Sequence, residues 1–149
     1  MRLGKTNLEV NKNGFGALPI QRCNMNEAVE ILKKAYDNGI NFFDTAIGYQ
    51  NGTSEHYVGR AVREYASRSD IVVATKFLPR SEEDIRNDVT GQQHIHNMVE
   101  KSLSNLGLDY IDLYIYHMWD YNTPLYDILE GLNEVIEEGK VKYIGISNC

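Results

Sequence analysis

The chain has 149 residues and a formal net charge of −6 at neutral pH, from 15 basic and 21 acidic side chains. A chain of this length suits one domain with a real hydrophobic core, and its acidic balance disfavours a nucleic-acid partner. No apolar run approaches the roughly 18 residues of a membrane span, and "MRLGKTNLEV" contains no hydrophobic signal region. We expect a cytoplasmic protein, not bound to membrane, whose Cys23 and Cys149 form no metal-ligand spacing.

Short apolar runs alternate with helical patterns along the chain. In order, we expect a strand at 14–18, a helix at 26–38, a strand at 40–44, a helix at 54–66, a strand at 71–76, a surface loop at 77–91, a helix at 92–106, a strand at 110–117, a helix that ends before Gly139 and a strand at 141–147. Each helical pattern places apolar side chains on one face, as Ala28 and Leu32 do in the first. Thr123 is expected to cap the last helix, with Pro124 in its first turn.

This alternating order is typical of parallel strands joined by crossover helices. Both a doubly wound dinucleotide-binding sheet and part of a (βα)8 barrel fit it. Gly14 and Gly16 supply the first two glycines of the dinucleotide fingerprint, but Pro19 stands where the third belongs. We therefore predict a single α/β domain over residues 1–149, of the TIM-barrel type.

Side chains that can take part in catalysis lie at the ends of four of the predicted strands. Asp44, Lys76, His117 and Ser147 each lie at the carboxyl-terminal end of a different strand, where barrel enzymes place their chemistry. Each has a plainer interpretation when taken alone, since an Asp before Thr commonly forms a turn and single Lys or His side chains are usually solvated or structural. Their convergence on one rim, together with Tyr49 shortly after Asp44, favours a site.

An acid, a phenol, an ammonium and an imidazole at one rim suit the reduction of a carbonyl group. A free phenol has a pKa of about 10 and is a poor proton donor near neutrality, but a nearby ammonium stabilises the phenolate. Lys76 can supply that charge, Asp44 can hold the lysine, and His117 can orient a carbonyl. Tyr49 can then protonate the oxygen as negative charge develops on it. No side chain donates a hydride, so a nicotinamide or a flavin is implied.

Six segments, in this order, resemble the aldo-keto reductase family. They are "GFGALPI", "FFDTAIGY", "SEHYVGRAV", "VVATK", "LDYIDLYIYH" and "GKVKYIGISN". The resemblance runs over essentially the whole chain and implies a (βα)8 barrel that reduces aldehydes or ketones with NADP(H) or NAD(H). It implies a catalytic tetrad of Asp44, Tyr49, Lys76 and His117. The cofactor-binding positions that it implies are Gly16, Ala17, Leu18, Asp44, Ser147 and Asn148.

The chain departs from the family pattern in two respects. Tyr49 is followed by Gln50, Asn51 and Gly52, whereas the family often has Gly or Ser directly after the tyrosine. A family barrel also has eight strands, and the family's last three strands, which hold the pyrophosphate and adenosine, are not expected here. We expect the 149-residue chain to be weakly active or inactive on its own. Its open sheet edges would be covered in a homodimer or by a complementing C-terminal segment.

Two further groups of residues call for interpretation. His94 and His96 resemble metal ligands, but residues two apart do not share a helix face, and we expect no metal. Tyr116, Trp119 and Tyr121 follow or end the fourth strand, where they line a substrate pocket or simply pack at the rim.

Two other functions remain open from the sequence. A Schiff-base lyase or aldolase would use Lys76 as its nucleophile, although a neighbouring Asp44 opposes the neutral amine that this needs. A non-catalytic fragment, or a nucleotide-sensing or interaction subunit of the kind found in the resembled family, is the second alternative.

Overall fold

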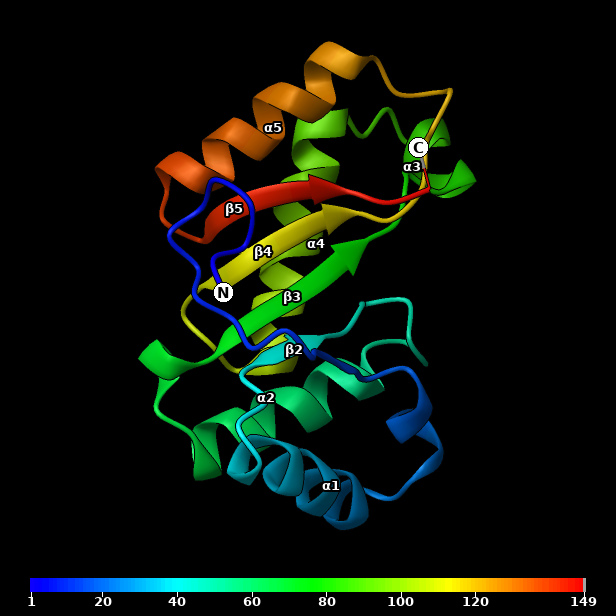
Figure 1. Cartoon of the computed structure of the whole chain (residues 1–149). Helices are drawn as coiled ribbons and strands as arrows, with labels where there is room; N and C mark the ends of the chain where they lie inside the picture. The colour runs from blue at the N-terminus through cyan, green and yellow to red at the C-terminus, as the bar shows by residue number, and fades with distance from the viewer. Residues whose placement is uncertain (149) are drawn as a thin grey trace.

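The computed structural model describes residues 1–148, and its framework is one sheet of parallel strands (Figure 1). The spatial order β1-β2-β3-β4-β5 follows the chain, as successive crossover connections require. The strands are β1 Phe15–Gly16, β2 Phe42–Asp44, β3 Val72–Phe77, β4 Ile111–Tyr116 and β5 Val141–Ile146. The predicted α/β class with five parallel strands is confirmed.

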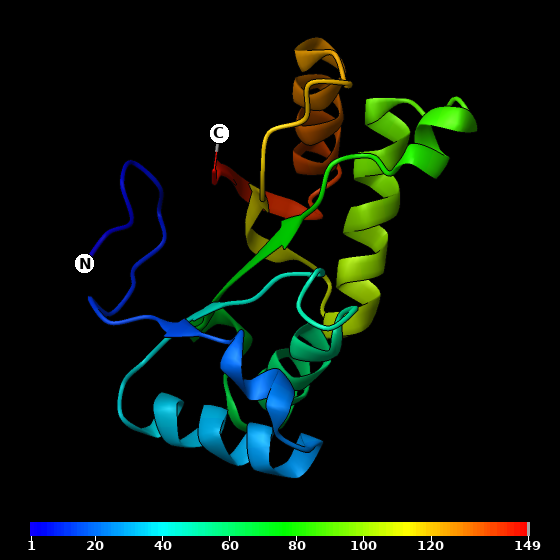
Figure 2. The same ribbon diagram turned by 90° about the vertical axis from the view of Figure 1, so that its right-hand side faces the viewer.

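The long helices lie together on one face of this sheet, and the N-terminal segment lies on the other (Figure 2). The helices are α1 Met25–Asp37, α2 Thr53–Tyr65, α3 Glu82–Arg86, α4 Gly91–Leu106 and α5 Leu125–Glu137, with short 3-10 turns at Pro19–Arg22 and Arg68–Asp70. Three of the helices begin with a reciprocal capping box, formed by Asn24 with Glu27 in α1, by Ser81 with Asp84 in α3 and by Thr90 with Gln93 in α4. These three helices therefore start where the sequence supplies a partner for their free N–H groups, whereas α2 and α5 have no side-chain cap.

The main core lies between the sheet and its helices. Strand β3 is buried at every position, so it forms the centre of this layer. Phe77 stacks between Tyr114 and Tyr116, with ring centroids 4.7 and 4.9 Å away. Rings at these separations contribute beyond their buried area, so the aromatic stack stiffens the carboxyl-terminal ends of β3 and β4.

A smaller apolar cluster closes the opposite face at the amino-terminal ends of the strands. Leu8 and Val10 pack there against Val72. The segment that carries them folds back on itself through an antiparallel bridge between Arg2 and Glu9. It covers the bottom of the sheet and leaves the carboxyl-terminal end open.

Three predictions about local structure were wrong. The segment 77–91 is not simply a loop, because helix α3 forms within it behind a capping box of Ser81 and Asp84. Thr123 does not cap α5. Pro124 is the N-cap there, without a side-chain bond, and the Thr123 hydroxyl bonds to other residues. Strand β1 is confined to Phe15–Gly16 rather than 14–18.

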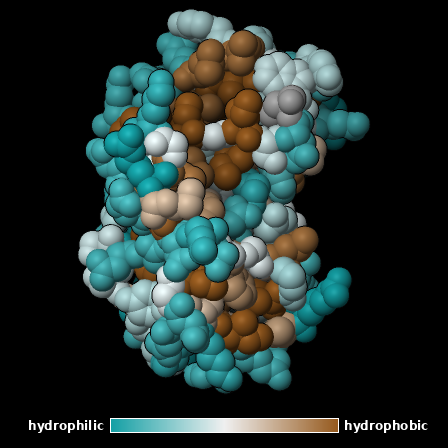
Figure 3. Space-filling model, in the orientation of Figure 1, coloured by the Kyte–Doolittle hydropathy of each residue, from teal (hydrophilic) through white to brown (hydrophobic). Residues whose placement is uncertain are grey.

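Apolar side chains are exposed along the β5 edge and on α5. Ile146 retains 75% of its accessible surface, and Ile144, Leu125 and Leu129 are also exposed. Figure 3 shows an apolar patch in the upper part of this face, where Figure 1 places α5 and β5. Strands β1 and β5 each pair with one neighbour only among the described strands. None of the described helices is long and apolar enough to cross a membrane.

Helices α2 and α4 approach so closely that a glycine is required between them. A Cβ atom added at Gly59 would lie 1.9 Å from the carbonyl oxygen of Leu106. We predict that Gly59→Ala lowers the free energy of unfolding by about 2 kcal/mol or more, because the helices must separate. Gly16→Ala is the control, since a Cβ there meets nothing within 4 Å. Urea unfolding followed by circular dichroism measures both, and equal stabilities would contradict the predicted clash.

Candidate active site

The candidate residues come from successive strand ends, as the parallel sheet dictates. Asp44 is the last residue of β2, Lys76 lies one residue before the end of β3, and His117 directly follows β4. In the ladder, Asp44 pairs with Ala74 and Lys76 with Ile115. Since alternate residues of a strand face opposite sides, Lys76 projects away from the helix-covered side on which Phe77 packs.

The buried ammonium group of Lys76 is the centre of the site. The residue is only 7% exposed, and Nζ lies 2.7 and 2.8 Å from the two carboxylate oxygens of Asp44. Nζ also donates to the carbonyl oxygen of Thr45 at 2.8 Å and to the hydroxyl of Tyr49 at 3.3 Å. A buried charge is tolerated when it is paired and hydrogen-bonded, and these contacts meet that condition. The structure thus brings Asp44, Tyr49 and Lys76 together as predicted.

His117 completes the group from the neighbouring strand. Its ring lies 6.0 Å from that of Tyr49, centroid to centroid, in an edge-to-face arrangement. Burial lowers the pKa of His117, and the positive charge of Lys76 lowers it further, while Asp44 opposes both. The imidazole is therefore neutral near pH 7. Its Nδ1 is buried and has no hydrogen-bond partner among the described residues.

The loop that carries Tyr49 is held in an uncommon conformation. Gln50, Asn51 and Gly52 all have positive φ angles, of 50, 52 and 87°. Two non-glycine residues in this region store backbone strain, which is frequent at functional sites. The loop is anchored on both sides of the bend, because Ile47 donates its N–H to the carbonyl of Lys76 and α2 begins directly after Gly52.

Buried polar contacts behind the sheet support this loop, and they were not found from the sequence. Thr45 donates its hydroxyl to Ser54 at 2.8 Å, and Ser54 donates to the carbonyl of Ala17 at 2.9 Å. Glu55, which is fully buried, accepts from Thr75 at 2.6 Å and from an amide on α4 at 2.8 Å. The only sequence signal was a polar Ser-Glu pair in the first turn of an amphipathic helix.

The predicted cofactor positions surround the same end of the sheet. Ala17 is buried and donates its N–H to the carbonyl of Asp44 at 2.8 Å, while Gly16 and Leu18 are exposed. Beyond β5, the Asn148 side-chain nitrogen donates to the carbonyl of His117 at 3.1 Å and to the hydroxyl of Ser147 at 2.9 Å. The backbone from 16 to 18 and the end of β5 thus both adjoin the candidate catalytic residues.

An open hollow adjoins the Tyr49 loop. It has a volume of about 430 Å³ and is lined by Leu18, Gln21, Arg22, Gly48, Tyr49 and Gln50. The side-chain oxygen of Gln21 is buried without a hydrogen-bond partner among the described residues. Tyr49 thus forms part of the wall of this open hollow, next to the backbone of the loop that carries it.

The predicted aromatic pocket residues differ in their surroundings. Tyr116 is buried in the core against Phe77. Trp119 and Tyr121 lie in the turn beyond β4 and are exposed. These two, rather than Tyr116, are accessible to a ligand.

The two helix histidines bind protein groups. His94 donates through Nε2 to the carbonyl of Leu78 at 2.7 Å, and His96 lies 2.9 Å from a carboxylate oxygen of Glu134. No group of three or more potential metal ligands occurs within residues 1–148.

Comparison with known proteins gives this arrangement a family. Residues 12–149 match the aldo/keto reductase family. The chain belongs to this family. It is 38% identical over 132 residues to an aryl-alcohol dehydrogenase of Pestalotiopsis microspora, a match that covers 85% of this chain and 34% of that protein. The resemblance predicted from the six sequence segments is thereby confirmed.

Solved aldo-keto reductases share the fold. The holo form of an enzyme from Bacillus halodurans superposes with a TM-score of 0.86 at 32% identity, covering 99% of this chain and 49% of that one. A Klebsiella pneumoniae aldo-keto reductase in complex with NADPH gives a TM-score of 0.78 at 30% identity, covering 91% and 45%. The five strands thus match the N-terminal half of these barrels, and the chain spans about a third to a half of the length of the relatives it matches.

The environment of His117 leads to a titration prediction. We expect an NMR titration midpoint below the usual histidine pKa of about 6.5, because burial and Lys76 disfavour the imidazolium. Lys76→Met should raise the midpoint by removing a positive charge, and Asp44→Asn should lower it further. The unfolded chain takes up this proton at a higher pH than the folded chain. The stability due to neutral His117 is therefore fully present at pH values above the pKa of the unfolded chain. It declines as the pH falls toward the lower pKa of the folded chain.

The wild-type chain, titrated under the same conditions, is the reference for both variants. A His117 midpoint at or above the usual histidine value, or shifts of the wrong sign in the two variants, would contradict the described electrostatics.

Proposed function

We propose that the complete protein reduces aldehydes or ketones with NADPH or NADH. The observation that carries this proposal is the Lys76 ammonium group, which lies 2.7 Å from Asp44 and 3.3 Å from the Tyr49 hydroxyl. This arrangement provides a phenol whose developing negative charge is stabilised by an adjacent cation. Such a phenol can protonate an oxygen atom near neutral pH.

Each residue of the group has a role in this proposal. Tyr49 donates a proton to the carbonyl oxygen, and Lys76 stabilises the phenolate that results. Asp44 holds Lys76 in place through both carboxylate oxygens. Neutral His117 directs a hydrogen bond at the substrate oxygen and so orients the carbonyl group.

The rim of the sheet fits a nicotinamide cofactor, which when bound supplies the hydride. Gly16 leaves the backbone open, since a Cβ there would meet nothing within 4 Å. Ser147 and Asn148 lie beside His117, since the Asn148 nitrogen donates to the carbonyl of His117 and to the Ser147 hydroxyl, and in this proposal both side chains contact the carboxamide. Ala17, Leu18 and Asp44 complete the contact surface in this proposal.

A Schiff-base lyase or aldolase is less compatible with the geometry. A lysine that attacks a carbonyl carbon needs a free electron pair on Nζ. Here Nζ donates to Asp44, to the carbonyl of Thr45 and to Tyr49. These contacts support an electrostatic role for Lys76.

We propose further that residues 1–149 form one partial barrel domain. It would be completed by a C-terminal segment or by a second copy of the chain. The exposed apolar residues on β5 and α5 support this, because contiguous apolar surface of this kind marks interaction sites. Until the barrel is completed, the chain would bind the cofactor weakly and show little or no reductase activity.

The proton-donor assignment is tested by Tyr49→Phe in the complete protein. We expect turnover to fall by about 10² or more, in the range of general acid catalysis, while NADPH binding measured by fluorescence titration persists. Tyr65→Phe is the control, because Tyr65 lies exposed at the end of α2. Turnover near the wild-type value in Tyr49→Phe would remove Tyr49 from this role.

The proposed association is tested on the 149-residue chain. Light scattering should show a mass that rises with concentration, because the β5 edge and its apolar side chains can pair between copies. Ile146→Lys should reduce this association, whereas Ile31→Lys, on the exposed side of α1, should leave it unchanged. A concentration-independent monomer would contradict completion of the barrel by a second copy.

A further inference from the structure

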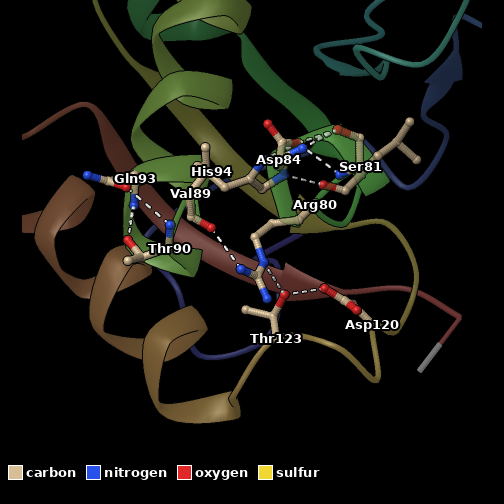
Figure 4. A network of polar contacts seen from close by, with 10 residues as sticks. Arg80, Ser81, Asp84, Val89, Thr90, Gln93, His94, Asp120 and Thr123 are labelled. Carbon is tan, nitrogen blue, oxygen red and sulfur yellow. Dashed lines mark hydrogen bonds and ion pairs between the residues drawn. The ribbon is translucent and has the colours of Figure 1, made fainter. Parts of the chain in front are cut away.

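Arg80 joins two loops at the carboxyl-terminal end of the sheet. It lies between β3 and α3, and all three of its guanidinium nitrogens donate hydrogen bonds. Figure 4 shows those to Thr123 and Val89. Nε donates to the Thr123 hydroxyl at 2.8 Å, and the two terminal nitrogens donate to the carbonyls of Val89 and Asn122, both at 2.7 Å. A planar guanidinium can satisfy several fixed acceptors at once, so the loop before α4 and the turn before α5 share one cation.

A buried carboxylate completes this connection. Asp120 is 5% exposed and accepts the Thr123 hydroxyl and the Asn122 N–H. The Thr123 hydroxyl therefore accepts from Arg80 and donates to Asp120, which places a hydroxyl between a cation and an anion. Hydrogen bonds to charged groups are about twice as strong as neutral ones, and both of these bonds are of that kind.

The Arg80 side of the connection is itself anchored. Ser81 and Asp84 form the capping box of α3 directly after Arg80, and His94 donates to the carbonyl of Leu78 at 2.7 Å. Figure 4 shows these residues converging on the same region from α3 and α4. Arg80 is thus attached to a fixed segment and donates to the carbonyl of Asn122, at the end of the turn over 118–122.

That turn carries the two accessible aromatic side chains beyond His117. Trp119 is 37% exposed and lies 6.4 Å from the Tyr116 ring on one side and 6.4 Å from the Tyr121 ring on the other. Tyr121 itself is 92% exposed. A ring this exposed gains little from core packing, so the conformation of the turn rests on its polar contacts.

We propose that Arg80 is a positioning residue that holds the 118–122 turn, so that Trp119 and Tyr121 form an aromatic wall beside His117. This wall selects carbonyl compounds that carry an aromatic or other bulky apolar group. The substrate part of this inference rests on the proposed reductase function. The structural part concerns only the turn and can be measured without activity.

Trp119 is the single tryptophan of the 149-residue chain, so its fluorescence reports on the turn alone. Arg80→Ala should raise acrylamide quenching of Trp119 by about two-fold and lower its fluorescence anisotropy, since a segment with few remaining contacts opens locally. Arg86→Ala, which removes an exposed arginine from α3, should leave both values unchanged. Thr123→Val should reproduce the Arg80→Ala change, whereas Thr123→Ser, which keeps the hydroxyl, should not.

The Thr123 pair keeps the test decisive if Arg80→Ala fails to fold. Unchanged quenching and anisotropy in folded Arg80→Ala or in Thr123→Val would overturn the positioning role. In the complete enzyme, Arg80→Ala should raise KM for an aromatic aldehyde by about ten-fold while kcat for a small aliphatic aldehyde stays near wild type. If KM rises equally for both aldehydes while the quenching and anisotropy of Trp119 change as expected, the selectivity role alone is overturned. If the wild-type enzyme has no reductase activity, the proposed function is refuted instead.

Discussion

A buried ammonium group must be surrounded by oxygen atoms, and this requirement organises the carboxyl-terminal end of the sheet. Lys76 can remain buried because Asp44, the last residue of the neighbouring strand, accepts a hydrogen bond from it. The backbone carbonyl of the following residue, Thr45, accepts another. Parallel pairing brings β2 and β3 to the same edge, so the ion pair needs no long loop to form. The position of Tyr49 then follows, since its hydroxyl occupies the remaining side of the cation.

Contacts on both faces of the sheet stabilise this edge. Polar groups meet on the open side, while Thr45 and Thr75 extend to the helix side and bind Ser54 and Glu55 in the first turn of α2. A carboxylate in the first turn of a helix is favoured by the helix dipole. Helix α2 therefore fixes β2 and β3 from behind, without entering the site.

Much of this could be predicted from the sequence, because the strands are continuous apolar runs that end in polar residues. Asp44, Lys76 and His117 were recognisable as strand ends, and the parallel order placed them on one rim. Helix α3 was missed because five residues are too few to show an apolar period. Thr123 was misassigned because capping residues also form tertiary hydrogen bonds, and the Ser54 and Glu55 contacts depend on which strands pack beneath α2.

The bend before α2 also limits which sequences this fold can accept. Position 52 has a φ of 87°, and a Cβ atom there would lie 2.3 Å from the Asn105 amide nitrogen, so both conformation and space call for glycine. Positions 50 and 51 favour residues that tolerate the left-handed region, such as Asn51. Sequence drift next to Tyr49 is therefore confined to a few residue types, although this loop carries one of the candidate catalytic side chains.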